Sequence, residues 1–199
     1  MVFIDPSIDE LANYDYTFIH VTNGILDKYN ISDYFNRVKN CKKILYLAIK
    51  ITKINYFEHL VNLFENNSSI ENLCIYKCNF SHEDLECLDN IINHQFNKIS
   101  RVELNHCNII EKFRDIFCDI FKYNITLECI WIYTHNNQMY DENIKLVEDI
   151  LSTNFTLVHV VVYDGHNRVY CFNDLLTSEK KEERKIAFYK NKIIKSARF

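Results

Sequence analysis

The sequence predicts an α/β protein made of repeated strand–helix units, with a parallel sheet on one side and helices on the other. One observation is a short apolar pattern that recurs along the chain, and a second is the helical spacing of apolar residues between its copies. A third is the scarcity of glycine and proline, which number two and one among 199 residues. Few tight turns and no flexible linker are therefore expected, which favours one continuous domain.

The recurring pattern is apolar-x-x-apolar-x-apolar-x-x-(Cys or polar), and its alternation is typical of a strand with one buried face. Two copies are nearly ideal, namely Ile70, Leu73, Ile75 and Cys78, and Ile99, Val102, Leu104 and Cys107. The series continues with Leu127, Ile130 and Ile132 and with Leu157, Val160 and Val162, and it is preceded by Leu45 and Leu47. The copies that start at residues 70, 99, 127 and 157 recur every 28 to 30 residues, which is one strand plus one helix.

Between the strand copies, apolar residues recur at three- and four-residue steps, as on the buried side of a helix. The four sets are Phe57, Leu60, Val61 and Phe64; Leu85, Leu88, Ile91 and Ile92; Phe113, Ile116, Phe117 and Ile120; and Ile144, Val147, Ile150 and Leu151. Ser81 ahead of Asp84 is a candidate cap for the second helix. Each repeat is thus expected to be a strand followed by a helix.

The step length and the links from helix to strand resemble the ribonuclease-inhibitor-like subclass of leucine-rich repeats. The links share the form Asn-x-Ser/Thr-apolar and begin at Asn67, Asn124 and Asn154. The resemblance covers residues 42 to 165 and implies a short arc or horseshoe, with a parallel sheet on the concave face and helices on the convex face. The sequence departs from the pattern at His135 and Gly165, which stand where Cys78 and Cys107 stand in the nearly ideal copies.

The repeat pattern divides the chain into three segments. Residues 1–41 are expected to form an N-terminal cap with a degenerate first repeat, in which Ile19 and Val21 point inward and a helix covers residues 31–38. Residues 42–173 are expected to hold the leucine-rich repeats, with five or six strands in all. Residues 174–199 are expected to form a basic C-terminal capping helix or tail.

Side chains between the inward aliphatic residues of each strand are expected to form the candidate binding surface. Aligning the copies places Tyr46 beside Cys74, and it places Ile44 in the flanking column with Asn72. Large aromatics with a polar tip are common interface anchors, and the single Trp lies here. The candidate partner-binding residues are Tyr46, Tyr76, Arg101, Glu103, Trp131, Tyr133, His159 and Tyr163. The alternative is that these aromatics only stack as cross-strand ladders.

The C-terminal segment is a second candidate site because its charge differs from that of the rest of the chain. From residue 179 to residue 199 there are eight Lys or Arg and three Glu, which gives a net charge of +5 in a chain of net charge −4. The candidate RNA-binding residues are Arg184, Lys185, Lys190, Lys192, Lys195 and Arg198. The alternative is a solvated capping helix whose cations complement the helix dipole.

Enzymatic chemistry is not expected from this sequence. Two glycines cannot build a phosphate-binding loop, and no Cys–His–acid arrangement is evident. Cys74, Cys78 and His82 are close in sequence, but alternation on a strand separates the two thiols, so no metal site is expected. We therefore expect no catalytic residue, cofactor or small-molecule substrate.

The expected function is protein–protein interaction, as a subunit or adaptor, and the alternative is a ribosome-associated accessory factor that contacts RNA. We expect an intracellular, cytoplasmic protein whose eight cysteines are reduced, because no secretory signal is visible. No membrane partner is expected, because no apolar run is long enough to span a bilayer.

Overall fold

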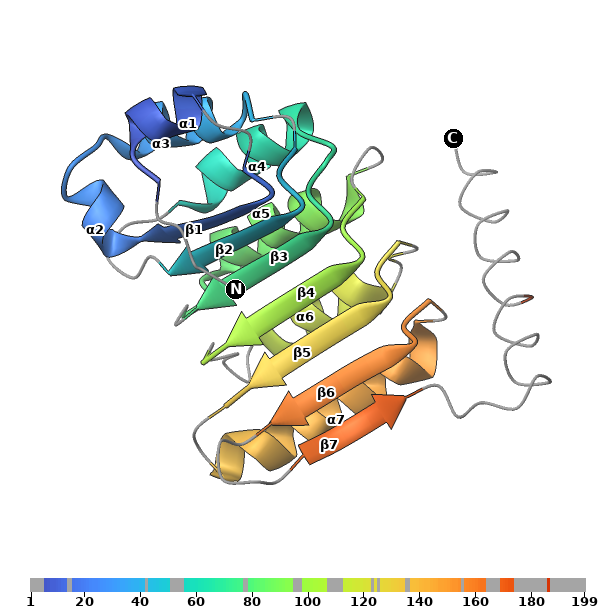
Figure 1. Ribbon diagram of the computed structural model, residues 1–199. Coiled ribbons are helices and arrows are strands. Elements are labelled where there is room, and N and C mark those ends of the chain that lie inside the picture. Colours follow the sequence, from blue (N-terminus) through green and yellow to red (C-terminus); the bar gives the residue numbers. More distant parts are fainter. Residues whose placement is uncertain are drawn as a thin grey trace.

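The protein is an α/β fold with one mostly parallel sheet of seven strands (Figure 1). The computed structural model describes residues 6–13, 16–41, 43–50, 56–76, 79–94, 98–106, 113–122, 124, 126–134, 137–154, 156–163, 169–173 and 186. The strands are β1 (Phe18–Thr22), β2 (Tyr46–Lys50), β3 (Asn72–Tyr76), β4 (Arg101–Asn105), β5 (Cys129–Tyr133), β6 (His159–Tyr163) and β7 (Val169–Asn173). They lie side by side in chain order, in a sheet that is neither closed nor strongly curled.

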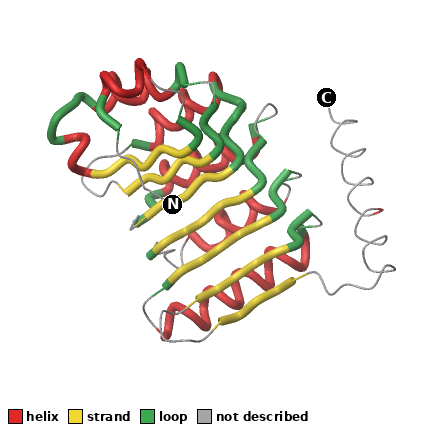
Figure 2. The backbone as a smooth tube through the Cα atoms, in the orientation of Figure 1, coloured by secondary structure: helices red, strands yellow, loops and turns green. Residues whose placement is uncertain are grey.

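Helices alternate with the strands along the chain. They are α1 (Ile8–Asn13), α2 (Asn23–Leu26), α3 (Ile31–Val38), α4 (Phe57–Asn66), α5 (His82–Asn93), α6 (Arg114–Lys122) and α7 (Asn137–Thr153). From α3 to α7 each helix packs against the next, and α1 packs against α3. Figure 2 shows that α4 to α7 all lie along the same side of the sheet. We call the opposite side the open face.

The core lies between the sheet and these helices. Each of the first six strands contributes two aliphatic side chains that are at most 1% exposed, namely Ile19 and Val21, Leu47 and Ile49, Leu73 and Ile75, Val102 and Leu104, Ile130 and Ile132, and Val160 and Val162. Across the helix side runs a chain of ring contacts from Phe57 through Phe80 to Phe117, with centroids 5.8 and 6.4 Å apart. The predicted alternation of inward and outward residues is confirmed for β3 to β6, whereas Leu45, which was placed with the inward residues, is exposed.

The register of β2 differs from the predicted alignment by two residues. Tyr46 pairs with Asn72 and Ala48 pairs with Cys74, so Tyr46 is not in the column of Cys74. The placement of Ile44 in an outward column was also wrong, because this side chain is fully buried. Ile44 instead begins the strand copy that continues with Leu47 and Ile49. A shift of two residues keeps every side chain on its face, so alternation alone does not detect it.

The strand and the helix predicted near the N-terminus are present, whereas the last strand was not anticipated. Ile19 and Val21 are buried in β1, and α3 covers residues 31–38. At the other end β7 runs antiparallel to β6, with Val161 opposite Cys171. The parallel repeat pattern therefore ends at β6 and does not extend to residue 173. Of residues 174–199 the structure describes only Ile186, so the predicted capping helix and its six basic residues lie outside the described part.

Buried asparagines hold the links between helices and strands. The Asn154 amide donates to the Phe121 carbonyl at the end of the preceding helix, over 2.6 Å, and its oxygen accepts from the Thr156 and Leu157 backbone N–H groups. Asn124 makes the same kinds of bond one repeat earlier. Each asparagine thus satisfies backbone groups that would otherwise be buried without partners, and it fixes where the next strand begins.

The helix that follows β3 begins as the sequence predicts. The Ser81 hydroxyl accepts from the Asp84 N–H, and the Asp84 carboxylate accepts from the Ser81 N–H, which is a capping box at the start of α5. Among the residues that the structure describes, none of the helices combines the length and apolar character that crossing a bilayer requires.

We predict that Asn154→Ala lowers the free energy of unfolding by about 2 kcal/mol, because the substitution leaves buried backbone groups without hydrogen-bond partners. Urea unfolding followed by circular dichroism measures the change. Asn90→Ala is the matched control, since Asn90 is exposed on α5, and its effect should stay within about 0.5 kcal/mol. Equal effects of the two substitutions would contradict a supporting role for the buried amide.

Candidate functional site

The open face carries two groups of aromatic side chains from neighbouring strands. Near β1, the rings of Phe18 and Tyr46 stack with centroids 4.5 Å apart. Near β5 and β6, the ring centroid of Trp131 lies 6.0 Å from that of Tyr133 and 5.9 Å from that of His159. Tyr133 in turn meets Tyr163 edge-to-face at 5.8 Å. These contacts show that the predicted cross-strand stacking is present at this face. Such pairs add stability beyond that of the apolar area they bury.

Between the two aromatic groups, Arg101 is held in place by two neighbours. Its guanidinium carbon lies 3.7 Å from the centroid of the Trp131 ring, which is a cation–π contact. Its Nε lies 2.9 Å from Oε1 of Glu103, two residues along the same strand. Trp131 stands opposite Glu103 on the adjacent strand, so the arginine reaches diagonally across the pair. The strand register therefore places the cation, the indole and the carboxylate together.

A polar cluster lies beneath the open face around Cys74. The Cys74 thiol lies 3.7 Å from Oε2 of Glu103, and the Asn105 amide donates to the sulfur over 3.0 Å. Cys74 is fully buried, and Glu103 and Asn105 are each only 8% exposed. The Tyr46 and Tyr76 phenols lie close to the same thiol. This part of the face is therefore closed by its own side chains.

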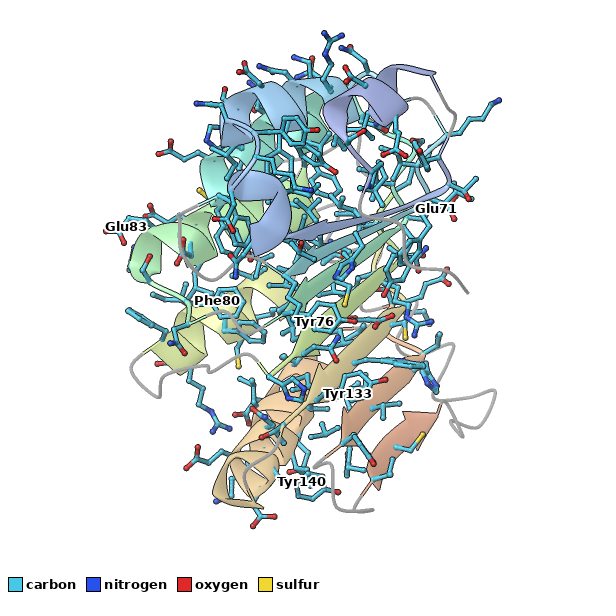
Figure 3. All side chains as sticks on the ribbon, turned by 60° about the vertical axis from the view of Figure 1, so that its left-hand side comes forward. Glu71, Tyr76, Phe80, Glu83, Tyr133 and Tyr140 are labelled. Atoms are coloured by element: carbon cyan, nitrogen blue, oxygen red, sulfur yellow. The ribbon has the colours of Figure 1, made fainter. Side chains whose placement is uncertain are left out.

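The outward side chains of the strands form three rows across the sheet, and the middle row contains small residues that explain why these groups are buried. Ala48 and Cys74 are adjacent in the sheet, and both are fully buried although they point away from the helices. Larger side chains lie around them: His20 is the neighbour of Ala48 in the same row, and its ring centroid lies 6.1 Å from that of Tyr76 in the next row. Tyr76 and Tyr133 are labelled over the strands in Figure 3, whereas Phe80 lies toward the helices.

Burial changes the acid–base behaviour of these groups. Burial, with a further contribution from the Glu103 carboxylate, raises the pKa of Cys74 from its ordinary 9.0 to about 12. Burial also raises the pKa of Tyr133 to about 12, and it raises the pKa values of Tyr46 and Tyr76 above the ordinary 10.0. The thiol and these phenols are therefore neutral at physiological pH.

The structure places all eight predicted partner-binding residues at outward strand positions of one face but does not expose them equally. Tyr46, Tyr76, Trp131, Tyr133, His159 and Tyr163 are half-buried there, and the Arg101 side chain is 30% exposed. Glu103 is buried, so its carboxylate supports Arg101 from within the face.

Sequence reasoning missed Phe18 and His20 as members of the open face. Both are half-buried and contact the predicted tyrosines. A signal was present, because inward Ile19 and Val21 imply that the residues beside them point outward.

The described residues offer no metal centre of three or more His, Cys, Asp or Glu side chains. The six cysteines within the described ranges form no disulfide, and of these Cys41 and Cys74 are buried whereas Cys171 is exposed. Cys78 and Cys107 lie outside the described residues. A scan against models of known protein families finds no match, and no curated protein has a significantly similar sequence.

We predict that Cys171 is alkylated in the native protein while Cys74 is protected, because Cys74 is buried and its raised pKa keeps it protonated. Iodoacetamide labelling at mildly alkaline pH, followed by peptide mass spectrometry, measures both sites. Labelling after denaturation should make the two thiols equally reactive. Fast labelling of Cys74 in the folded protein would show that the open face is not closed above it.

We also predict that the native state loses stability in alkaline solution. The unfolded chain ionises Cys74 near its ordinary pKa of 9.0, whereas the native chain holds the proton to about 12. The free energy of unfolding should therefore be constant at neutral pH and fall as the pH rises from about 9 toward 12. Chemical denaturation across this range tests the trend, and Cys74→Ala should make the fall less steep. An unchanged slope in this variant would argue against the raised thiol pKa.

Proposed function

We propose that this chain is a non-enzymatic leucine-rich-repeat protein of the ribonuclease-inhibitor-like type that binds a protein partner through its open face. The architecture is supported by alternating strand–helix units in chain order and by the repeated inward aliphatic pairs. In this proposal the open face is the concave face of a shallow arc, and the Asn-x-Ser/Thr links close each repeat.

The observation that carries the binding proposal is the group of Arg101, Trp131, Tyr133, His159 and Tyr163 on one side of the sheet. Arg, Trp and Tyr are the residue types that contribute most binding energy at protein interfaces. Their mutual contacts fix their orientations before a partner arrives, which reduces the entropy lost on binding. Figure 2 shows the described helices α4 to α7 on the other side of the sheet from this face.

We predict that replacing Trp131 and Tyr133 together by Ala lowers capture of the partner from native lysate by about tenfold or more, because two interface anchors are removed. Quantitative mass spectrometry of the co-purified proteins measures the loss. His82→Ala is the control, since His82 is an exposed ring on the helix side, and it should leave capture unchanged. Circular dichroism confirms that both variants fold.

An unchanged set of captured proteins in the Trp131 and Tyr133 variant would reject the open-face proposal. The composition of residues 179–199 supports RNA binding by the basic tail as the alternative. Capture that persists in this variant, weakens steeply with salt and disappears when the chain ends at Ser178 would favour that alternative.

A further inference from the structure

The charged groups of the protein are distributed unequally between the two sides of the sheet. Among the outward positions of the described strands, Glu103 carries the only carboxylate, whereas Lys50 and Arg101 carry positive charge. Exposed carboxylates lie on the helices, at Glu58, Glu86, Asp119 and Glu148, and in the links just before β3 and β5, at Glu71 and Glu128. The outward strand positions themselves therefore carry one more positive than negative charge.

The contacts of Arg101 leave part of its guanidinium available. Its Nε faces Oε1 of Glu103, and the other oxygen of that carboxylate lies near Cys74. Within the described part of the chain, Glu103 is the only residue shown to pair with the Arg101 guanidinium through an ion pair. The side chain is 30% exposed, so solvent and ligands reach it. Two parallel N–H donors on a planar group match the two oxygens of a carboxylate.

The surroundings of Arg101 also hold the guanidinium in a fixed orientation. The indole of Trp131 lies against the guanidinium at 3.7 Å, and Oε1 of Glu103 lies 2.9 Å from Nε, close enough for an ion pair. A long arginine side chain loses considerable rotamer freedom when it is immobilised, and here that cost is met within the free protein. Glu103 offsets part of the positive charge, so a ligand gains mainly through directed hydrogen bonds.

We propose that the open face recognises an acidic segment of a protein partner, with a carboxylate of that segment bound bidentately by Arg101 over Trp131 and with apolar or aromatic side chains of the segment packed on Tyr133 and Tyr163. This inference rests on the proposed function and specifies its partner. The excess of positive charge at the outward strand positions and the partly exposed guanidinium of Arg101 favour an acidic peptide chain over a basic one.

The single tryptophan of the chain provides a direct readout, because Trp131 is itself in contact with Arg101. The probe is a peptide in which Glu alternates with Phe and which contains no Trp or Tyr. The matched peptide has Gln in place of every Glu. We expect a saturable change in tryptophan emission with the Glu peptide and not with the Gln peptide. Isothermal calorimetry on the full chain gives the affinity independently.

Arg101→Gln and Arg101→Lys should each weaken binding of the Glu peptide by about tenfold or more, because neither retains the planar pair of donors. The Lys variant keeps the positive charge. Weak binding by this variant therefore shows that bidentate hydrogen bonds from the guanidinium, and not charge attraction alone, recognise the carboxylate. Circular dichroism verifies folding, and the conservative Lys variant serves if the Gln variant does not fold. Equal binding of the two peptides, no binding of either, or full binding by the Lys variant would overturn the proposal.

Further measurements distinguish a peptide carboxylate from a phosphate as the ligand. They also distinguish failure of the carboxylate inference from failure of the proposed function. If inorganic phosphate or oligouridylate produces the emission change in preference to the Glu peptide, the acidic-peptide assignment is wrong. If the Trp131 and Tyr133 variant loses its captured partner while Arg101→Lys retains it, the proposed function stands and the carboxylate inference fails. If neither variant loses the partner, the proposed function itself fails.

Discussion

The parallel pairing of adjacent strands is held by aliphatic side chains that each strand buries against the helices, and the position of every other group depends on this pairing. Leu73 and Ile75 lie beside Val102 and Leu104 in register, and all four are fully buried. Slipping a strand by one residue would turn its aliphatic pair toward the open face and would remove several kcal/mol of hydrophobic stabilisation. The same register places Trp131 opposite Glu103, so the arrangement around Arg101 follows from the core.

The two sides of the sheet use different chemistry to exclude water. The helix side is filled by aliphatic and phenylalanine side chains, whereas the open face closes over a thiol, a carboxylate and an amide. A buried carboxylate costs several kcal/mol unless it has partners, and Glu103 has Arg101 and Cys74 within reach. The central strands thus combine a polar interior with a rim of aromatic rings that orient one another.

Much of the fold follows from local patterns in the sequence, while parts of the site depend on pairing that these patterns do not specify. The alternation of β3 to β6, the helical spacing and the Ser81 cap all correspond to elements of the structure. The register of β2 was misassigned because its two possible alignments keep the same faces. Burial of Cys74 and Glu103 was missed because outward residues were assumed to be exposed, and burial depends on the size of neighbours such as Ala48. The antiparallel β7 lacks the repeat pattern altogether.

The asparagine links have a consequence for covalent modification. Asn67, Asn124 and Asn154 each lie in an Asn-x-Ser/Thr triplet, the acceptor sequence for N-linked glycans, yet each is at most 5% exposed. The side-chain nitrogen that would carry the sugar donates instead to a backbone carbonyl of the preceding repeat. A glycan and the folded link therefore exclude each other at these positions, and attachment of a sugar at any of the three would identify chains that had not completed that repeat.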